Sequence, residues 1–524
     1  MSQEATTEPE REGGTTSVAP LPPVAGPAVA IAGATTLLLL LVGARYGFHR
    51  DELYFLEASK HMAWGYVDQP PLSVALIWLT RHTIGESVFA IRILPALASG
   101  GTVLFTALMT RELGGGRFPQ VLAALCAGFA PLILAGGHLA GPTVYDLLAW
   151  TVVSLLIMRI LRTGNERLWL AVGLVVGIAL LDKETILFLV GGLFLGLLFT
   201  GRGRMLVSPG LWGGAAIALV IWSPNLVWEF ANGWPTVEMS RNLHAEHSGL
   251  AYSIKYVPFQ MLILGFASAP VWLSGAWALW REERFRPYRA FAVAFAILFA
   301  MIGLLMADRP YYLGGLFFVM LAAGAIVTEE VVAGRRRFFS EKPPRRRLIW
   351  RSRGAAVTFV VVLGVLTIPL SLPIFPASSL ATVQLQNVNY NLGEMIGWPH
   401  MVAEIASVYR SLPTAERAHA VVFTSNYGEA GAVDLYGPPI GLARAYSGHN
   451  SFWWWGRPPD GTTTVVAVGY DAGYLRRYFD NVRPAGHLEN GLGVADDEEG
   501  QPIDVATGPR RPWSVLWPEF RHYG

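Results

Sequence analysis

Apolar runs of roughly 17 to 25 residues recur between residues 27 and 376, and a run of this length lets a helix cross the hydrocarbon core of a bilayer. Hydrophobic residues fill 52% of the 524 positions and charged residues only 15%, which is unlike a soluble domain. The runs predict an all-α polytopic membrane protein with about eleven transmembrane helices. They lie near residues 27–47, 89–110, 119–136, 142–158, 168–181, 185–200, 211–228, 257–280, 290–306, 311–333 and 354–376.

The charges of the connecting loops predict the orientation of these helices. Lys and Arg gather in alternate loops, and the positive-inside rule assigns such loops to the cytoplasm. This alternation and the odd number of spans predict a cytoplasmic N-terminus and an extracytoplasmic C-terminus. The basic loops contain Arg111 and Arg117, Arg159 to Arg167, Arg202 and Arg204, Arg281 to Arg289, and the cluster between Gly334 and Leu348.

Composition divides the chain into three parts. Residues 1–25 are rich in Thr, Glu, Pro and Gly, which predicts a disordered cytoplasmic tail. Residues 26–377 contain all the predicted spans. In residues 378–524 the apolar residues form short runs, such as AVVFT at 420–424 and TTTVVAVG at 462–469, between Gly, Pro and Asn turns. This pattern predicts a small extracytoplasmic α/β domain.

Net charge and cysteine content exclude several other classes of protein. The net charge of +2 is too small to indicate binding to nucleic acid. The single cysteine, Cys126, allows neither an intrachain disulfide nor a thiolate metal cluster. An extracytoplasmic domain without disulfides is more typical of a bacterial plasma-membrane protein than of a lumenal eukaryotic one.

The segment between the first two predicted spans is long and amphipathic. The stretch WGYVDQPPL at 64–72 predicts two short helices at the membrane interface, broken at Pro70 and Pro71. Trp64, Tyr66 and Trp78 are expected at headgroup level. Such a layer is either a plain interfacial anchor or a cover over a site for a lipid-borne substrate.

Ionisable residues at membrane depth are costly, so each needs a partner or a function. In this chain they cluster at the predicted outer ends of several spans, where they would outline a polar cavity. Taken singly, each also fits a simple loop or interface residue; a carboxylate in a first helical turn is favourable by itself. The set comprises Asp51, Glu52, His138, Asp146, Asp182, Lys183, Glu184, Asp308, Arg309, Tyr311 and Tyr312.

The order of these motifs resembles that of the GT-C glycosyltransferases. More narrowly, it resembles the bacterial branch related to dolichyl-phosphate-mannose protein mannosyltransferases and lipid A aminoarabinose transferases. The resemblance rests on RYGFHRDELYF, WGYVDQPPL, GIALLDKET and DRPYYLGGLFFVMLAAG and covers about residues 30–335. SNYGEAGAVDLYG at 425–437 and SGHNSFWWWG at 447–456 extend it into the tail. It implies the GT-C fold and a sugar donor carried on a polyprenyl phosphate in the lipid bilayer.

The resemblance also implies roles for single residues. Asp51 matches the family's proposed catalytic base, with Glu52 beside it. Lys183 matches a lysine thought to contact the donor phosphate, and the basic-aromatic stretch of the family matches the group of Arg309, Tyr311 and Tyr312. Asp146 matches a family aspartate near the fourth span. Substrate-binding roles are predicted for Asp146, His138, Tyr66 and Asp68.

These assignments predict an inverting transfer to an acceptor hydroxyl. A phosphate leaving group is a weak base, so its departure needs positive charge more than a proton, and one carboxylate with nearby cations suffices. Asp51 would deprotonate the acceptor, while Lys183 and Arg309 would stabilise the phosphate. The acceptor stays open between protein, lipid and polysaccharide.

Two alternatives remain at this point. A membrane transporter or lipid flippase would also use an outward polar cavity, although transporters usually carry an internal repeat and charges at mid-membrane, and neither is visible here. No cofactor is required by the sequence. A divalent metal is a further alternative, because Asp51, Glu52, His49 and His138 are suitable ligands.

Overall fold

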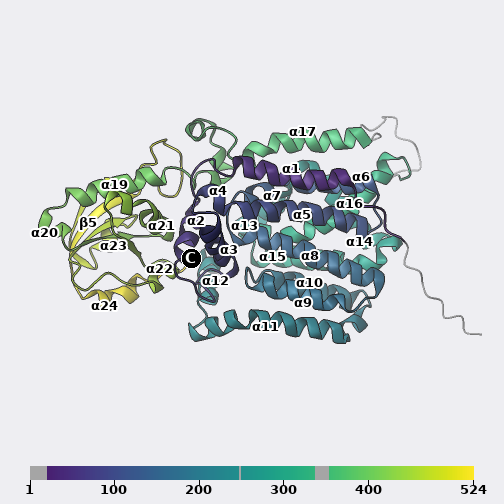
Figure 1. The fold of residues 1–524 in the computed structure, drawn as a ribbon, viewed down its shortest axis with the longest axis horizontal. Coiled ribbons are helices and arrows are strands. Elements are labelled where there is room, and N and C mark those ends of the chain that lie inside the picture. Colours follow the sequence, from purple (N-terminus) through teal and green to yellow (C-terminus); the bar gives the residue numbers. More distant parts are fainter. Residues whose placement is uncertain (1–19, 247–249, 337–352) are drawn as a thin grey trace, which may run out of the picture.

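The computed structural model describes residues 20–246, 250–336 and 353–524. Apolar helices form a bundle at one end of the molecule, a small α/β domain forms the other end, and short helices lie between them (Figure 1). The predicted helical membrane part and the predicted C-terminal α/β part are both confirmed. The domain boundaries after residues 25 and 377 stay predictions.

Long helices make up the bundle. They are α1 (Gly26–Val42), α5 (Ile93–Glu112), α6 (Arg117–Gly128), α7 (Pro131–Gly137), α8 (Pro142–Thr163), α9 (Leu168–Leu180), α10 (Ile186–Phe199), α11 (Pro209–Ala231), α13 (Leu250–Leu264), α14 (Ala269–Arg281), α15 (Arg289–Leu305), α16 (Gly314–Val332) and α17 (Arg353–Ser371). Short 3₁₀ turns join some of them, including η2 (Phe266–Ser268) and η4 (Pro310–Leu313).

Among the described residues, six helices are long and apolar enough to cross a membrane. Two pairs, α6 with α7 and α13 with α14, are bent by 55° and 90°, and they raise this number to eight if each pair is one span. The shorter apolar helices α1, α9 and α10 coincide with three further predicted segments. The multi-pass character is confirmed, whereas the exact count of eleven stays a prediction.

Part of the predicted N-terminal tail is ordered. Residues 1–19 of that tail lie outside the described residues, as does the section 337–348 of the predicted basic cluster. The Pro22 carbonyl accepts a hydrogen bond from Nε of Arg111 at 2.7 Å. The backbone N–H of Ala25 donates to the buried side chain of Gln120 at 2.8 Å. Residues 20–25 are thus attached to the ends of α5 and α6.

Most side chains of helix α16 are buried against other helices of the bundle. It packs against α14 at backbone distance: a Cβ added at Gly275 would lie 1.9 Å from the carbonyl oxygen of Met320. Small residues allow such close approach of helices in membranes, where packing rather than hydrophobicity drives association. Helix α16 follows directly after η4, so its packing also holds Tyr311 and Tyr312 of η4 in place.

The α/β domain contains one five-stranded sheet within the described residues, with strand order β2-β1-β3-β5-β4. Strand β1 pairs in parallel with β2 and β3, while β5 pairs antiparallel with β3 and β4. The strands are β1 (Ala420–Thr424), β2 (Ala445–Ser447), β3 (Thr464–Val468), β4 (Phe479–His487) and β5 (Pro502–Pro509). Both strands predicted from sequence, β1 and β3, are confirmed. The accompanying helices are α18 (Leu380–Val383), α19 (Trp398–Ser411), α20 (Thr414–Arg417), α21 (Tyr427–Tyr436), α22 (Ser451–Trp454), α23 (Ala472–Leu475) and α24 (Trp513–Leu516).

Short helices join the two parts: α2 (Arg50–Ala58), α3 (Leu72–Thr83), α4 (Val88–Ile91) and α12 (Pro235–Glu246). As predicted, short helices occupy the segment between the first two predicted spans, and α3 begins directly after Pro71. Trp64 and Trp78 are exposed, but Tyr66 is only 2% exposed. Its hydroxyl accepts from the Ala63 N–H at 3.2 Å and lies 3.3 Å from the Ala58 carbonyl oxygen. Tyr66 therefore packs within its own loop, and its placement at headgroup level stays a prediction.

Candidate functional site

A cavity of about 390 Å³ lies where α2, the α7–α8 connection, α13 and the segment after α17 meet. Its walls are mostly apolar. Asp51 and Glu52 are the carboxylates among the described residues that line it, and Tyr311 contributes from η4. A largely apolar pocket with a few converging polar groups is the usual form of a ligand site. Three of the predicted groups, Asp51, Glu52 and Tyr311, are thus brought to one cavity.

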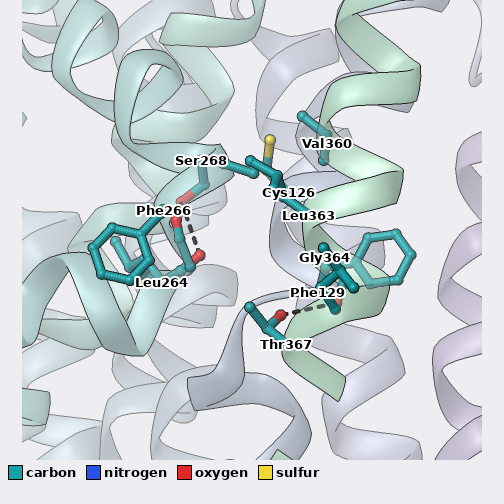
Figure 2. A pocket seen from close by; sticks show the side chains of 12 residues that line it. Cys126, Phe129, Leu264, Phe266, Ser268, Val360, Leu363, Gly364 and Thr367 are labelled. Carbon is teal, nitrogen blue, oxygen red and sulfur yellow. Dashed lines mark hydrogen bonds between the residues drawn. The ribbon is translucent and has the colours of Figure 1, made fainter. Parts of the chain in front are cut away.

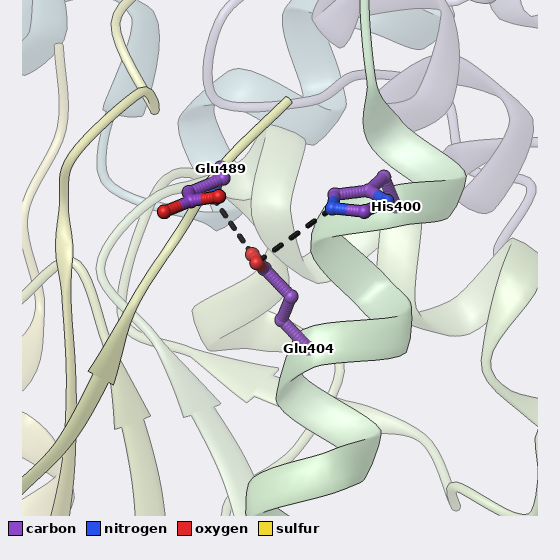
Figure 3. A group of neighbouring side chains, drawn as sticks. All are labelled: His400, Glu404 and Glu489. Atoms are coloured by element: carbon purple, nitrogen blue, oxygen red, sulfur yellow. Dashed lines mark hydrogen bonds and ion pairs between the residues drawn. The ribbon is translucent and has the colours of Figure 1, made fainter. Parts of the chain in front are cut away.

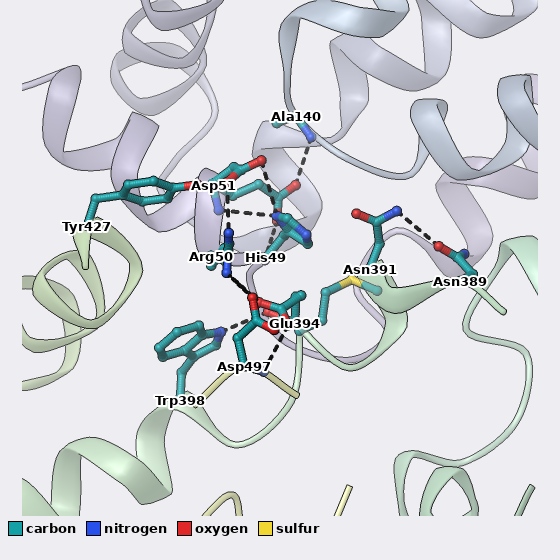
Figure 4. A network of polar contacts seen from close by, with 12 residues as sticks. His49, Arg50, Asp51, Ala140, Asn389, Asn391, Glu394, Trp398, Tyr427 and Asp497 are labelled. Carbon is teal, nitrogen blue, oxygen red and sulfur yellow. Dashed lines mark hydrogen bonds and ion pairs between the residues drawn. The ribbon is translucent and has the colours of Figure 1, made fainter. Parts of the chain in front are cut away.

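Asp51 has the more accessible carboxylate of the pair, with 46% of its side chain exposed. Its backbone N–H donates to Nδ1 of His49 at 3.1 Å, as part of a capping box that starts α2. The Tyr427 hydroxyl donates to its Oδ1 at 2.8 Å (Figure 4). Oδ2 has no hydrogen bond in the described structure, so it can still accept a proton from a substrate.

Glu52 has a different environment and is completely buried. Its carboxylate accepts from Nε and one terminal nitrogen of Arg92, at 2.9 and 2.7 Å. It also accepts from the backbone N–H groups of His49 and Ala140, both at 2.8 Å. These bonds join α2 to α5 and to the α7–α8 connection, so the described contacts favour a positioning role for Glu52 over a catalytic one.

The other predicted substrate-binding residues are largely engaged within the protein. Nε2 of His138 lies 3.0 Å from a terminal nitrogen of Arg92. Asp146 accepts from the indole N–H of Trp150 at 2.9 Å and from the Thr185 hydroxyl at 2.8 Å. Neither His138 nor Asp146 lines the cavity.

Asp68 lies close to Asp51 beside α2. Its Oδ1 accepts from the Tyr54 hydroxyl at 2.6 Å. Burial raises the pKa of Asp68 to about 7, against the opposing effect of that hydrogen bond. The nearby charge of Asp51 adds to the rise. Asp68 therefore holds its proton at a pH where most aspartates are ionised.

The predicted phosphate-binding residues form one cluster beside the cavity. Nζ of Lys183 lies 5.0 and 4.8 Å from the ring centres of Tyr311 and Tyr312. It is 3.4 Å from the hydroxyl oxygen of Thr143, which itself lines the cavity. A terminal nitrogen of Arg309 donates to the Tyr312 hydroxyl at 3.1 Å. Aromatic faces stabilise the two cations. Nε of Arg309 also pairs with the Asp308 carboxylate at 3.3 Å.

The short α9–α10 connection that carries Lys183 is fixed by its neighbour Asp182. The Ser73 hydroxyl donates to the buried Asp182 carboxylate at 2.5 Å, and the Leu72 N–H donates to the Leu181 carbonyl oxygen at 2.6 Å. These bonds attach the first turn of α3 to the connection. Helix α3 thus helps to set the position of Lys183.

Several cavity residues were not predicted from sequence. Asn389, Tyr390 and Asn391 line the cavity from the segment after α17, and Nδ2 of Asn391 donates to Oδ1 of Asn389 at 3.0 Å (Figure 4). The run NVNYN at 387–391 resembles an ordinary polar loop. Arg92 was also missed, although an arginine at the start of an apolar span is a recognisable signal.

A smaller apolar pocket of about 110 Å³ adjoins the cavity (Figure 2). Cys126 and Phe129 from α6 and its end, and Val360 and Leu363 from α17, form two of its walls. It shares Gly265, Phe266 and Thr367 with the larger cavity. The two pockets are therefore neighbours, and the smaller one lies between the end of α6 and α17.

The metal alternative finds little support at the cavity, since Glu52 and His138 are both bound to Arg92. Among the described residues, one group could hold a metal: His400, Glu404 and Glu489, whose ligand atoms lie within 4.8 Å of one another. This group belongs to the α/β domain and is largely exposed (Figure 3). Glu404 already accepts from the Glu489 N–H at 2.7 Å. It lies outside the cavity lining.

Comparisons with known proteins agree with this architecture. The family model for dolichyl-phosphate-mannose-protein mannosyltransferases matches residues 68–228. The comparison with curated protein sequences gives no significant match.

Among solved structures, ArnT from Cupriavidus metallidurans bound to undecaprenyl phosphate aligns with a TM-score of 0.56. Identity is 16%, over 91% of this chain and 97% of that one. Arabinofuranosyltransferase AftD from Mycobacteria aligns with a TM-score of 0.51 and 13% identity, over 92% of this chain and 40% of that one. Likeness at this identity establishes the fold alone: this chain is a multi-pass membrane protein with the fold of ArnT, and its residues 68–228 are similar to the mannosyltransferase family.

Proposed function

We propose that this protein transfers a sugar from a polyprenyl phosphate to an acceptor hydroxyl at the outer face of a bacterial plasma membrane, with inversion at the anomeric carbon. The observation that carries the proposal is the cavity itself. It combines one accessible carboxylate, Asp51, with Tyr311 and, beside it, Lys183. The orientation rests on the positively charged loops at the opposite ends of the helices.

In the proposed reaction Asp51 takes the proton of the acceptor hydroxyl as its oxygen attacks the anomeric carbon. The bond from that carbon to the phosphate oxygen breaks, and the electron pair stays with the phosphate. Lys183 and Arg309 stabilise the resulting charge, with Tyr311 and Tyr312 holding the two cations. A preorganised cationic site is effective here because its charges are already in place when negative charge develops on the phosphate.

The remaining cavity residues fit the other parts of such a donor. The amides of Asn389 and Asn391 can bond to sugar hydroxyls. The apolar pocket around Phe129 and Leu363 suits the first isoprene units of the lipid. In this proposal the contacts of Arg92 with Glu52 and His138 hold the segments that form the cavity walls in their relative positions.

The experiment is a donor panel. Purified protein in lipid nanodiscs is incubated with polyprenyl phosphates carrying different labelled hexoses and pentoses, together with a membrane extract as the source of acceptor. Turnover of one donor, with release of polyprenyl phosphate and label in a new product, is the expected result. If no donor is consumed and the reconstituted protein instead moves a lipid or solute across the bilayer, the transporter alternative holds.

A further inference from the structure

The α/β domain contacts α2 directly, and α2 carries Asp51. Helix α21 of the domain lies against α2 at very short distance, because two glycines face it. A Cβ added at Gly431 would lie 2.9 Å from the Leu53 carbonyl group, and one at Gly428 would lie 2.9 Å from Cβ of Arg50. No larger residue fits there without moving one helix away from the other.

An ion pair strengthens the same contact. Arg50 of α2 pairs with Asp497 of the domain at 2.5 Å and lies 3.5 Å from the buried carboxylate of Glu394 (Figure 4). Asp51, the next residue, is therefore carried on a helix whose position depends on the domain. Glycine packing and the ion pair together fix α2 relative to the α/β domain.

Tyr427 is the first residue of α21 and reaches from this contact into the site. Its ring packs against Tyr54 with centres 4.9 Å apart and against His449 at 4.8 Å. The Arg50 guanidinium lies 5.7 Å from the ring centre. Its hydroxyl donates to Oδ1 of Asp51 at 2.8 Å. The ring is thus held from several sides, and within the described part of the chain its hydroxyl donates to the carboxylate of the proposed base.

We infer that Tyr427 is a positioning residue for Asp51, so that the α/β domain completes the active site. This inference rests on the proposed function. A half-exposed aspartate can adopt several rotamers. The bond to Oδ1 selects one of them and leaves Oδ2 to accept the proton of the acceptor hydroxyl. A hydrogen bond to a charged group is stronger than one between neutral groups, so loss of this bond should lower the rate of transfer.

The test is a double-mutant cycle on Tyr427 and Asp51. Y427F removes only the hydroxyl, and Y436F on the same helix serves as the matched control. Each is made in the wild-type and the D51N background, and single-turnover rates, donor KM and thermal unfolding are measured for all of them. Y427F should lower kcat about 10- to 100-fold with donor KM and Tm near those of the wild type. In D51N, Y427F should cost less than about 2-fold further, because the group through which it acts is gone.

Three outcomes would overturn the inference: no loss of rate in Y427F, an equal fold loss in both backgrounds, or a drop in Tm that parallels the loss of rate. Y436F should match the wild type throughout. These results differ from a failure of the proposed function, in which the wild type itself would consume no polyprenyl-phosphate sugar.

Discussion

At the scale of single residues, the adjacent carboxylates Asp51 and Glu52 have opposite surroundings. Asp51 is half exposed and keeps one oxygen without a hydrogen bond, whereas Glu52 is buried against Arg92. A buried charge pair is costly to break, because the remaining partner stays desolvated and unpaired. We therefore expect Glu52 to stabilise the fold and Asp51 to take part in the reaction.

Substituting Glu52 tests this division. E52Q should destabilise the protein by about 3–5 kcal/mol, since Arg92 would lose its counter-charge in a buried site. Thermal unfolding in detergent measures the effect, with E57Q on the same helix as the control at a partly exposed pair. If E52Q unfolds like the wild type and loses only transfer, then Glu52 takes part in the chemistry after all.

Sequence reasoning at this scale found the residues that stand in motifs. Asp51, Lys183, Arg309, Tyr311 and Tyr312 all lie at or beside the cavity. The burial of Tyr66 could not be predicted, since burial of an aromatic residue in its own loop leaves no periodic signal. Partners of buried residues were also missed: the pairing of Glu52 with Arg92 joins positions 40 residues apart.

At the scale of elements, the hydrogen bond from Ser73 to Asp182 joins α3 to the α9–α10 connection. The buried Asp182 has a second oxygen without a described hydrogen-bond partner, so the Ser73 hydroxyl is its main support. Burial raises the pKa of Asp182, which that hydrogen bond partly offsets. The position of Lys183 should depend on this contact.

S73A should therefore lower donor affinity and stability together. Leaving a buried carboxyl group without its bond costs about 1–3 kcal/mol, and the freed connection would misplace Lys183. S223A, which removes an exposed hydroxyl on α11, is the matched control. Binding of polyprenyl phosphate and the Tm are the two readouts. If S73A binds polyprenyl phosphate as tightly as the wild type, the position of Lys183 does not depend on its contact with α3.

Elements with a strong local pattern could be predicted from the sequence, and those set by packing could not. The apolar runs gave the bundle helices, and the short β-branched runs gave β1 and β3. The bends between α6 and α7 and between α13 and α14 were missed, because the hydropathy of a bent pair is continuous. Segment 387–391 became a cavity wall only through its place in the fold.

At the scale of the whole molecule, buried carboxyl groups of the α/β domain make its stability depend on pH. Burial raises the pKa of Glu429 to about 7, while bonds from the Asn426 N–H and from Ser425 oppose the rise. In the unfolded chain the same group would ionise near its ordinary value. As pH increases from about 4.5 to 7 the unfolded state loses this proton first, so stability falls across that window and stays low above it.

E429Q tests the effect, because glutamine is a neutral substitute of the same shape. The wild type should unfold at a lower temperature at pH 8 than at pH 5, and this group contributes at most about 3 kcal/mol of the difference. In E429Q the unfolding temperatures at pH 5 and pH 8 should differ by less than in the wild type. The control E489Q, at an exposed position, should show the wild-type difference. A pH dependence of the same size in E429Q would contradict the assignment.

The relation between the two parts of the molecule could not be read from the sequence. The tail motif SNYGEAGAVDLYG indicated a turn and a helix, but not that its Tyr427 meets Asp51 across 376 positions of the chain. Long-range contacts of this kind depend on shape complementarity, here on the close approach at Gly428 and Gly431.

The measurement that tests the central claim most directly is release of polyprenyl phosphate by the wild type and by D51N, at equal protein and saturating donor. General-base catalysis contributes about 10²- to 10⁴-fold, so D51N should lose about that factor in kcat. D480N, at an exposed aspartate on β4, should keep the wild-type rate. A D51N variant that releases polyprenyl phosphate as fast as the wild type would contradict the role of Asp51 as the base.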